Sequence, residues 1–477
     1  MRENSYREDK DGLNELLHQY NKLREGIQYS LIDEDSFERI IDYYDDKDDL
    51  PSAMEAADHG IEQYPFSSIL QIKKADLLIA TRQYREALVW LEKAEILDRT
   101  DINLYILKTD AYLALDQQKK AAVLLEEAID TFEGEDRIEL LFELADVYDD
   151  YEEFDKVFNC LKLVLEQDPV NEEALYKICF WTDFTGRNEE GIKLHQQIIE
   201  EYPFTELAWF NLGAAYQGLK LYEKSIDAYQ YAIAIDEKFD YAYRNMGDAY
   251  LRMRRYKDAI EVLQKVLELT RPEDVIYEAI GHCYEKMKNH AQARFHYRKA
   301  SHLSPEDSHL YFKIASTYMN ENHWESAIKN LESALRIHKN KPDYNFALAQ
   351  CYVNMGKTKE AVIYFSTFIK SRPKNIKGWR ELIRCLYHSE FYEEAMEQVN
   401  NAVMHTGVKS ILIFYKSAIN FAIGHSKEAL VLLEIAMDQD PRLVKQFIEL
   451  NPSILQNQLV ADIISKYKKI KLSKPSK

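Results

Sequence analysis

Apolar residues recur along this chain at helical spacing, in short amphipathic stretches separated by polar turns. The segment that begins at Thr205 shows the pattern: a first set of apolar residues, a short polar stretch, and a second set. The two sets are Phe210, Leu212, Gly213 and Tyr216, followed by Tyr222, Ile226, Tyr229 and Ile233. Spacings of three and four residues place each set on one side of a helix, so the pattern predicts two short helices joined by a turn.

This two-helix pattern repeats every 34 residues. Steps of 34 from Trp209 reach Tyr243, Tyr277, Tyr311, Asn345, Trp379 and Ile413 without an inserted or missing residue. Backward steps reach Leu175 and Leu141, and after a two-residue offset near residues 132–136 they continue through Tyr105, Gln71 and Phe37. A period of this length is typical of a solenoid, whose repeats bury their apolar faces only against their neighbours.

Two columns of the repeat carry structural predictions. The first column holds small residues where two helices are expected to approach closely: Ala53, Ala87, Ala121, Ser225, Ala259, Ala293, Ala327, Ala361, Ala395 and Ala429. The second column holds six of the eleven prolines, namely Pro65, Pro169, Pro203, Pro305, Pro373 and Pro441. Proline lacks an amide donor and ends helices, so this column marks the turn between repeats.

The columns resemble those of the tetratricopeptide repeat, a 34-residue helix-turn-helix with Trp, Leu-Gly, Tyr, Ala, an aromatic residue, Ala and Pro at fixed offsets. The matching residues in one repeat are Trp209, Leu212, Gly213, Tyr216, Tyr229 and Ala232, with Ser225 in place of Ala and Glu237 in place of Pro. The resemblance covers residues 34–443 of the 477. The acidic, Tyr-rich composition is similar to that of arrays from Bacteroidetes-type bacteria.

The resemblance implies an all-α fold, a right-handed α-solenoid superhelix of about twelve helix-turn-helix repeats over residues 34–443. Repeat boundaries are expected near residues 68, 102, 138, 172, 206, 240, 274, 308, 342, 376 and 410. Because an array needs ends that water tolerates, we expect an N-terminal capping helix and lead-in over 1–33 and C-terminal capping helices over 444–470. An apolar face left open for a partner helix is the alternative. Residues 471–477 are expected to form a solvated, lysine-rich tail.

Composition excludes several classes of protein. A net charge of −20 argues against nucleic acid as the main partner, and against RNA-binding helical repeats. Five cysteines without a CxxC pair predict neither a disulfide framework nor a redox motif. The chain has no run of eighteen apolar residues that could span a membrane and no apolar signal segment near its start, so we expect a cytoplasmic protein. The oligomeric state stays open.

In the tetratricopeptide family the first helix of each repeat lines the inner surface of the superhelix, which often binds extended peptides or helices. Carried onto this chain, the groove residues are Phe210, Tyr241, Arg244, Glu278, His282, Phe312, Phe346, Gln350, Lys377, Arg380, Arg384 and Phe414. We expect Phe312, Phe346 and Phe414 to be exposed in one column, where large apolar side chains mark a contact surface. The earlier repeats predict an acidic groove, through Asp35, Glu38, Asp42, Asp45, Glu139, Asp146 and Asp149.

No constellation of catalytic residues is present, since HExxH, a glycine-rich phosphate loop and Gly-x-Ser-x-Gly are all absent from the sequence. Glu278, His282 and His309 lack the further ligand at metal spacing that a zinc site needs. We therefore expect no catalytic residue, cofactor or metal. The family's chaperone-tail clamp requires an Asn that is missing here, although Arg380 and Arg384 could hold an acidic peptide.

The sequence favours a non-catalytic scaffold or adaptor that binds a protein or peptide segment in its groove. The alternative is a regulatory or targeting subunit of an enzyme complex whose chemistry lies on another chain. One repeat, residues 172–205, departs from its neighbours because Thr182, Gly191 and His195 replace the usual tyrosine, alanine and large apolar residue. A glycine inside a helix costs about 0.5–1 kcal/mol relative to alanine, so we expect this repeat to be the most deformable joint.

Overall fold

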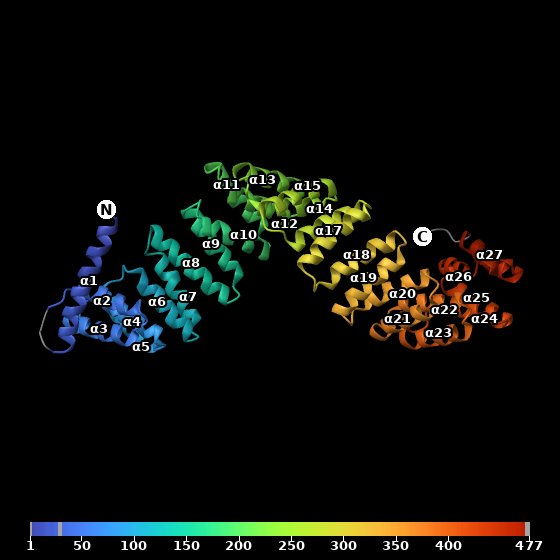
Figure 1. The fold of residues 1–477 in the computed structure, drawn as a ribbon, viewed down its shortest axis with the longest axis horizontal. Helices are drawn as coiled ribbons and strands as arrows, with labels where there is room; N and C mark the ends of the chain where they lie inside the picture. The colour runs from blue at the N-terminus through green and yellow to red at the C-terminus, as the bar shows by residue number, and fades with distance from the viewer. Residues whose placement is uncertain (1, 27–30, 473–477) are drawn as a thin grey trace. The chain divides into compact units, whose positions relative to one another are not determined.

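The computed structural model describes residues 2–26 and 31–472, and within these ranges the chain is all-helical, with 27 α-helices and two short 3-10 helices but no strand. Figure 1 shows the helices following one another in pairs along the chain. Residues 473–477 of the predicted lysine-rich tail lie outside the described residues. The predicted α-solenoid of consecutive two-helix repeats is confirmed.

Each repeat consists of a first and a second helix. The first helices are α2 (Glu34–Asp45), α4 (Ser68–Ala80), α6 (Ile102–Ala114), α8 (Gly134–Asp150), α10 (Glu172–Phe184), α12 (Glu206–Gly218), α14 (Asp240–Arg252), α16 (Asp274–Lys286), α18 (Ser308–Asn320), α20 (Pro342–Asn354), α22 (Ile376–His388) and α24 (Ser410–Ala422). The second helices are α3 (Leu50–Gln63), α5 (Tyr84–Leu97), α7 (Gln118–Ile129), α9 (Phe154–Gln167), α11 (Asn188–Glu201), α13 (Tyr222–Ile235), α15 (Tyr256–Leu269), α17 (His290–Leu303), α19 (Trp324–Ile337), α21 (Thr358–Ser371), α23 (Tyr392–Thr406) and α25 (Ser426–Gln439). The flanking elements are α1 (Arg2–Arg24), η1 (Pro441–Leu443), α26 (Val444–Leu450), η2 (Pro452–Gln456) and α27 (Gln458–Leu472).

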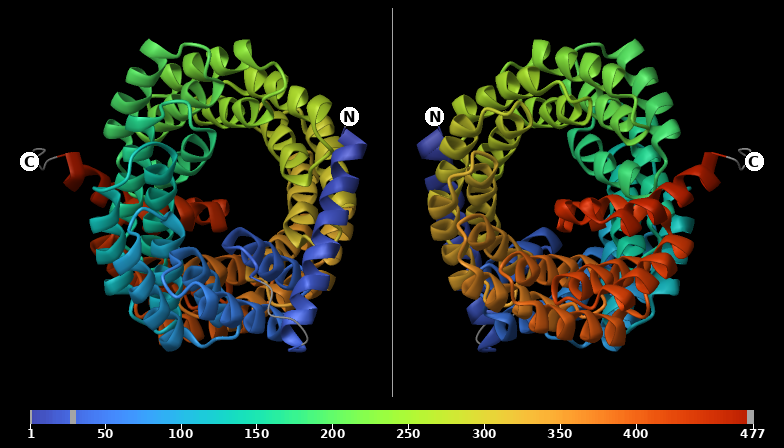
Figure 2. Two further views of the ribbon diagram at one scale, coloured as in Figure 1. Left: turned by 90° about the vertical axis from the view of Figure 1, so that its left-hand side faces the viewer. Right: turned by 90° about the vertical axis from the view of Figure 1, so that its right-hand side faces the viewer.

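The chain divides into two compact units, an N-terminal unit of residues 1–249 and a C-terminal unit of residues 250–477, with the division inside α14. In each unit a helix packs mainly against the next one along the chain (Figure 2). First helices of consecutive repeats also contact each other, as α2 does with α4 and α22 with α24, whereas consecutive second helices touch more weakly. The first helices therefore form the more tightly spaced, inner layer of each unit.

The small-residue column holds the two helices of a repeat together. Its ten predicted members, from Ala53 to Ala429, are all completely buried. At Gly213 and Gly281 an added Cβ would lie 2.6 and 2.7 Å from the rings of Tyr229 and Tyr297, because each tyrosine of the second helix packs onto the first-helix backbone. The predicted close approach of the helix axes is confirmed.

The turn inside each repeat uses one left-handed backbone position, which the sequence analysis did not identify. One residue per repeat has a φ of between 58° and 90° there, and these residues also lie 34 apart except across the two-residue offset. They are Asp48, Arg82, Asp116, Glu152, Gly186, Lys220, Arg254, Lys288, Asn322, Gly356, Glu390 and Gly424. Glycine adopts this conformation at no steric cost, which accounts for three of the chain's glycines.

The turn between repeats is fastened by a recurring side-chain hydrogen bond. The indole Nε1 of Trp209 donates to the carbonyl oxygen of Pro203 at 2.9 Å, and Trp379 makes the same bond to Pro373. In an earlier repeat the Gln71 amide donates to the Pro65 carbonyl oxygen, also at 2.9 Å. These donors share one column of the repeat, so a polar atom on a large side chain is what the position requires.

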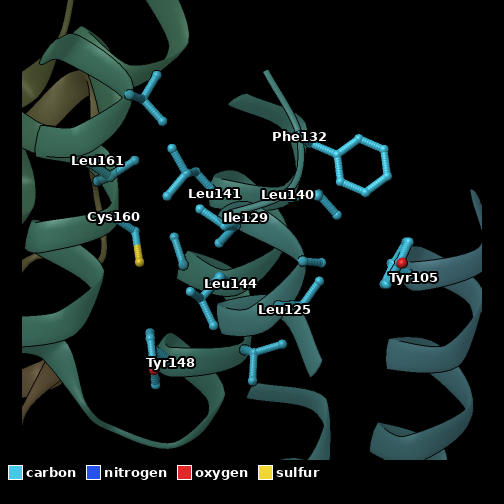
Figure 3. Close-up of a cluster of buried hydrophobic side chains, with 14 of the residues drawn as sticks. Tyr105, Leu125, Ile129, Phe132, Leu140, Leu141, Leu144, Tyr148, Cys160 and Leu161 are labelled. Carbon is cyan, nitrogen blue, oxygen red and sulfur yellow. The ribbon is translucent and has the colours of Figure 1, made fainter. Parts of the chain in front are cut away.

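The two-residue offset is absorbed at the start of α8. This helix has 17 residues where α10 has 13, and it begins at Gly134, whose φ is 64°. The core continues through the offset without interruption. Figure 3 shows Leu125 and Ile129 of α7, Leu141 and Leu144 of α8, and Leu161 of α9 gathered between their helices.

The repeat at residues 172–205 has the predicted substitutions packed against one another. An added Cβ at Gly191 would lie 2.7 Å from Cγ2 of Thr182, so the glycine makes room for the threonine. His195 is completely buried, and burial lowers its pKa to about 3, so the ring is neutral. The first helix α10 packs more extensively against α12 than against its own partner α11. The deformability of this repeat stays a prediction.

Enlarging a member of the small-residue column should overpack a helix pair. We expect Ala327→Leu to destabilise the protein by about 1–3 kcal/mol, because the position has no free space and the neighbouring helices must separate. The midpoint of thermal unfolding, followed by circular dichroism, measures the effect. Ala291→Leu, at an exposed alanine of α17, is the matched control. Equal midpoints for the two variants would contradict the close packing.

Candidate functional site

The inner layer of the N-terminal unit carries a column of aspartates. Asp42, Asp76, Asp110 and Asp146 occupy the same position in the first helices α2, α4, α6 and α8, one repeat apart. Asp76 and Asp110 are accessible to solvent, and Asp42 is half-buried. We call these four residues the aspartate column.

The electrostatic coupling of the carboxylates shows that they face one another across successive repeats. Partial burial, and next the negative charge of Asp45 in α2, raise the pKa of Asp76 above its ordinary range. Partial burial and the charge of Asp76 raise the pKa of Asp110. Partial burial and the charge of Asp110 raise the pKa of Glu143 in α8. Carboxylates that reach solvent and are still partly desolvated lie in a hollowed surface, so the inner layer is concave here.

Two lysines neutralise the ends of this acidic surface. Lys73 Nζ lies 2.5 Å from Asp42 Oδ1 and 3.8 Å from Glu38 Oε1. Lys177 Nζ in α10 lies 2.8 Å from Glu173 Oε1 and 3.9 Å from Asp146 Oδ1. In contrast, the carboxylates of Asp76, Asp110 and Glu143 form no ion pair within 4 Å with any residue that the structure describes; SB items and the remaining contacts place no cation on them. The surface keeps an excess of negative charge.

Beside the aspartate column, α10 exposes three aromatic side chains in one stripe. Tyr176, Phe180 and Phe184 are 66, 59 and 56% exposed, and their spacing of four residues places them on one side of the helix. Phe180 follows Asp146 by one repeat and therefore continues the column of aspartates. We call these three residues the aromatic stripe.

Neighbouring rings support the aromatic stripe. Phe180 and Phe184 stack with centroids 5.6 Å apart, and Phe184 lies edge-on to Phe154 at 4.9 Å. Trp181 stacks on Phe154 at 5.4 Å, which ties the stripe to the start of α9. A shallow hollow beside Phe184 is lined by acidic residues of the preceding turn, including Glu152, Glu153 and Asp155. The exposed rings are thus held in place by contacts with one another.

Sequence reasoning missed the aromatic stripe, although a signal for it was present. Tyr176 lies in the column of Phe210, and Phe180 lies in the column of His282 and Gln350, both of which were assigned to the groove. The repeat was interpreted only through its departures from the consensus. Reading its groove columns as well would have found both residues.

Three of the predicted groove residues belong to the N-terminal unit. Phe210 is half-buried, with its ring against Phe239 at 5.1 Å. Tyr241 is 52% exposed. Arg244 lies in α14, where its Nε donates to Asp240 Oδ2 at 2.8 Å. Of the three side chains, Tyr241 is the one that presents a large accessible surface.

The expected exposed column of phenylalanines in the C-terminal unit is wrong. Phe346 is buried against Phe365 and Phe368, and Lys377 Nζ lies 4.7 Å above its ring. Phe414 is completely buried, and Phe312 is half-buried against Tyr344. The column faces its own second helix and the following first helix, so its large side chains are part of the core.

The burial of Phe414 has a specific cause, the C-terminal segment of the chain. The ring of Phe447 in α26 lies 5.7 Å from that of Phe414 and is itself completely buried. At the end of α26, Asn451 Nδ2 donates to the hydroxyl of Tyr387 in α22 at 3.1 Å. The helix α26 therefore packs over the first helices α24 and α22 and covers the inner layer of the last repeats.

The predicted polar groove residues of the C-terminal unit lie on α20 and α22. Lys377 is exposed, and Gln350 is half-buried. Arg384 is partly accessible, with Nη1 3.5 Å from Glu381 Oε1. Arg380 is half-buried, bonds to the buried hydroxyl of Tyr415, and has no partner in the structure for its Nε. Arg380 thus acts partly as a packing residue.

Glu278 and His282 lie on α16, but they do not form a metal centre. Glu278 pairs with Lys313 of the next first helix, and His309 Nδ1 lies 3.9 Å from the same carboxylate. Burial and the charges of Lys286 and Lys313 lower the pKa of His282. Among the residues described, no three His, Cys, Asp or Glu side chains are grouped to hold a metal ion.

The cysteines of the first helices are buried side chains. Cys283, Cys351 and Cys385 are at most 6% exposed, and none of them is in a disulfide. Burial raises the pKa of Cys283 and Cys351 to about 12, so their thiols stay protonated. The interpretation of this column as small apolar packing positions is confirmed.

Two protein-family models match parts of the chain. The model of the tetratricopeptide repeat protein 21 C-terminal ARM domain matches residues 212–347, and that of subunit 3 of the anaphase-promoting complex, or cyclosome, matches residues 319–402. Both matches fall within the 34-residue columns and the helix pairs described above. The chain is a tetratricopeptide-repeat protein.

Solved structures with similarity to this tetratricopeptide-repeat chain include the following. YrrB, described as a TPR protein with an unusual peptide-binding site, is 17% identical over 39% of this chain and 96% of its own, with a TM-score of 0.35. The C-terminal part of a TPR repeat-containing protein from Cytophaga hutchinsonii is 17% identical over 51% of this chain and 99% of its own, with a TM-score of 0.45. The APC/C hetero-tetramer Cut9–Hcn1 is 14% identical over 83% of this chain and 90% of its own, with a TM-score of 0.34.

No curated protein matches the sequence of the chain. Within residues 2–26 and 31–472, no helix combines the length and the apolar character that crossing a membrane requires.

The aspartate column should destabilise the fold at neutral pH. A carboxyl whose pKa is raised in the folded state disfavours its charged form there, so it lowers stability above that pKa and the effect fades as pH falls through it. We expect Asp76→Asn/Asp110→Asn to raise stability at neutral pH by about 0.5 kcal/mol, the scale of exposed charge interactions.

Thermal midpoints at neutral and mildly acidic pH test this, with the gain expected to shrink in acid. Glu86→Gln/Glu127→Gln, at exposed positions of α5 and α7, removes the same charge away from the column. A gain that is the same at both pH values, or equal in the control, would show that the column carries no special repulsion.

The covering role of α26 predicts a local effect. Phe447→Ala removes a completely buried ring from Phe414, and we expect it to cost about 3–5 kcal/mol within the last repeats. Hydrogen exchange followed by mass spectrometry should show faster exchange in α24 and α26, with α16 to α18 unchanged. Leu455→Ala, at an exposed position of η2, serves as the control. Unchanged exchange in α24 would contradict the covering contact.

Proposed function

We propose that this protein is a non-catalytic scaffold or adaptor that binds a segment of another protein along the inner layer of its first helices. The observation that carries the proposal is the aromatic stripe, with Tyr176, Phe180 and Phe184 each more than half exposed on one helix. Exposed large apolar side chains that gather in one patch are typical of contact surfaces. Scattered single residues would not support the same conclusion.

The aromatic stripe has the properties of a binding anchor. Its rings are positioned by contacts with one another and with Phe154, so little side-chain freedom is lost when a partner covers them. Aromatic residues dominate the energy of protein interfaces because they bury a large area with few rotatable bonds. Position in the column that also holds the aspartates supports contact with one continuous segment.

A reducing, cytoplasmic setting is part of the proposal. All five cysteines are unpaired, and the buried ones lie in packing positions of the repeats. Unpaired cysteines at this number are typical of proteins from a reducing compartment.

Removal of the aromatic stripe should abolish partner binding without loss of the fold. We expect Tyr176→Ala/Phe180→Ala/Phe184→Ala to keep the wild-type thermal midpoint closely, because exposed side chains contribute little to stability, and to lose the partners of the wild-type chain. Quantitative affinity purification from the native cells, with mass spectrometry, measures the partner set.

Phe66→Ala/Phe204→Ala is the matched control, since both rings are more than 80% exposed in turns between repeats. Arg380→Ala/Arg384→Ala examines the groove assignment in the C-terminal unit. Retention of every partner by the variant of the aromatic stripe would refute the proposed binding surface.

A further inference from the structure

We propose that the inner layer of the N-terminal unit takes a basic protein segment that also carries large apolar side chains. The basic residues would lie along the aspartate column on α2 to α8, and the apolar side chains on the aromatic stripe of α10. This inference rests on the proposed function and adds the chemical class of its partner.

The common register is the first support. Asp42, Asp76, Asp110, Asp146 and Phe180 occupy one position in five consecutive first helices. A segment that runs along this column meets four carboxylates in succession and then a ring that is 59% exposed. The two surfaces also touch, because Lys177 of α10 lies within 3.9 Å of Asp146 Oδ1 and 5.0 Å above the ring of Phe142.

The sign of the charge is the second support. The two lysines of this surface already pair with Asp42, Glu38, Glu173 and Asp146. The carboxylates left over repel one another, as the raised pKa values of Asp76, Asp110 and Glu143 show. Cations laid along the column would relieve that repulsion, whereas an acidic segment would increase it.

The aromatic stripe narrows the partner further. A segment made only of lysine and arginine would leave three large rings exposed on α10. Leucine, methionine or aromatic side chains would bury those rings, and arginine could stack on them as well. The favoured ligand therefore combines both kinds of side chain, with the apolar ones at the end nearest α10.

Synthetic peptides with a fluorescein label test the inference on the full chain. The first peptide has a lysine-rich half followed by a half rich in leucine and phenylalanine. A second replaces each lysine by glutamate, and a third replaces each apolar residue by serine. Fluorescence anisotropy gives the affinities, and quenching of Trp181, which lies 4.9 Å from Phe180, reports occupation of the aromatic stripe. Trp181→Phe identifies that signal among the five tryptophans.

We expect the lysine–apolar peptide to bind most tightly, and to weaken as salt is added. Asp76→Asn/Asp110→Asn should weaken it roughly fivefold, on the scale of two exposed charge interactions, while Glu86→Gln/Glu127→Gln should leave it unchanged. Tyr176→Ala/Phe180→Ala/Phe184→Ala should weaken it by about tenfold or more.

Two outcomes would overturn the inference in distinguishable ways. Equal binding of the glutamate–apolar peptide, still lost in the variant of the aromatic stripe, would refute the basic partner and keep the proposed function. Binding of every peptide by that variant as by wild type would refute both. Sedimentation of the chain alone covers the remaining occupant, because self-association that the aromatic-stripe substitutions abolish would show that a second copy fills the surface and would overturn the inference.

Discussion

The close approach of the two helices within each repeat is the contact on which the rest of the structure depends. Alanine or serine at one position, completely buried in repeat after repeat, lets the second helix lie against the backbone of the first. Tyr229 and Tyr297 then pack where Gly213 and Gly281 leave no Cβ. A larger residue would alter the angle between the helices, and every later repeat would inherit the change. The fixed contact thus keeps the repeats in register.

Because the register is kept, a position in the sequence becomes a position on the surface. Residues one repeat apart fall side by side on neighbouring first helices, which is why Asp76 raises the pKa of Asp110 and Asp110 raises that of Glu143. The same geometry brings Phe180 into line with the aspartates. Function in this architecture is therefore written along columns that cross the helices, and a single helix shows only one residue of each.

The repeat and its packing positions could be predicted from the sequence, because they depend on neighbours at constant spacing. The buried alanines, the buried cysteines and the order of helix pairs followed from the columns alone. The left-handed turn position escaped notice because Asp, Arg, Lys, Glu and Asn share it with glycine. The accessibility of Phe414 could not be predicted, since Phe447 covers it from a segment outside the 34-residue register. Phe346 failed for a related reason, because three side chains from two helices enclose it.

The two units differ in what covers their first helices. In the C-terminal unit the chain places its own helix α26 over α22 and α24, so apolar side chains of the inner layer are buried within the molecule. In the N-terminal unit α10 leaves Tyr176, Phe180 and Phe184 open to solvent. The sequence tolerates an exposed stripe of this size only at the risk of nonspecific association, which the surrounding carboxylates reduce. An apolar patch framed by like charges excludes acidic and neutral surfaces and leaves basic ones, so the feature that limits association also selects the partner.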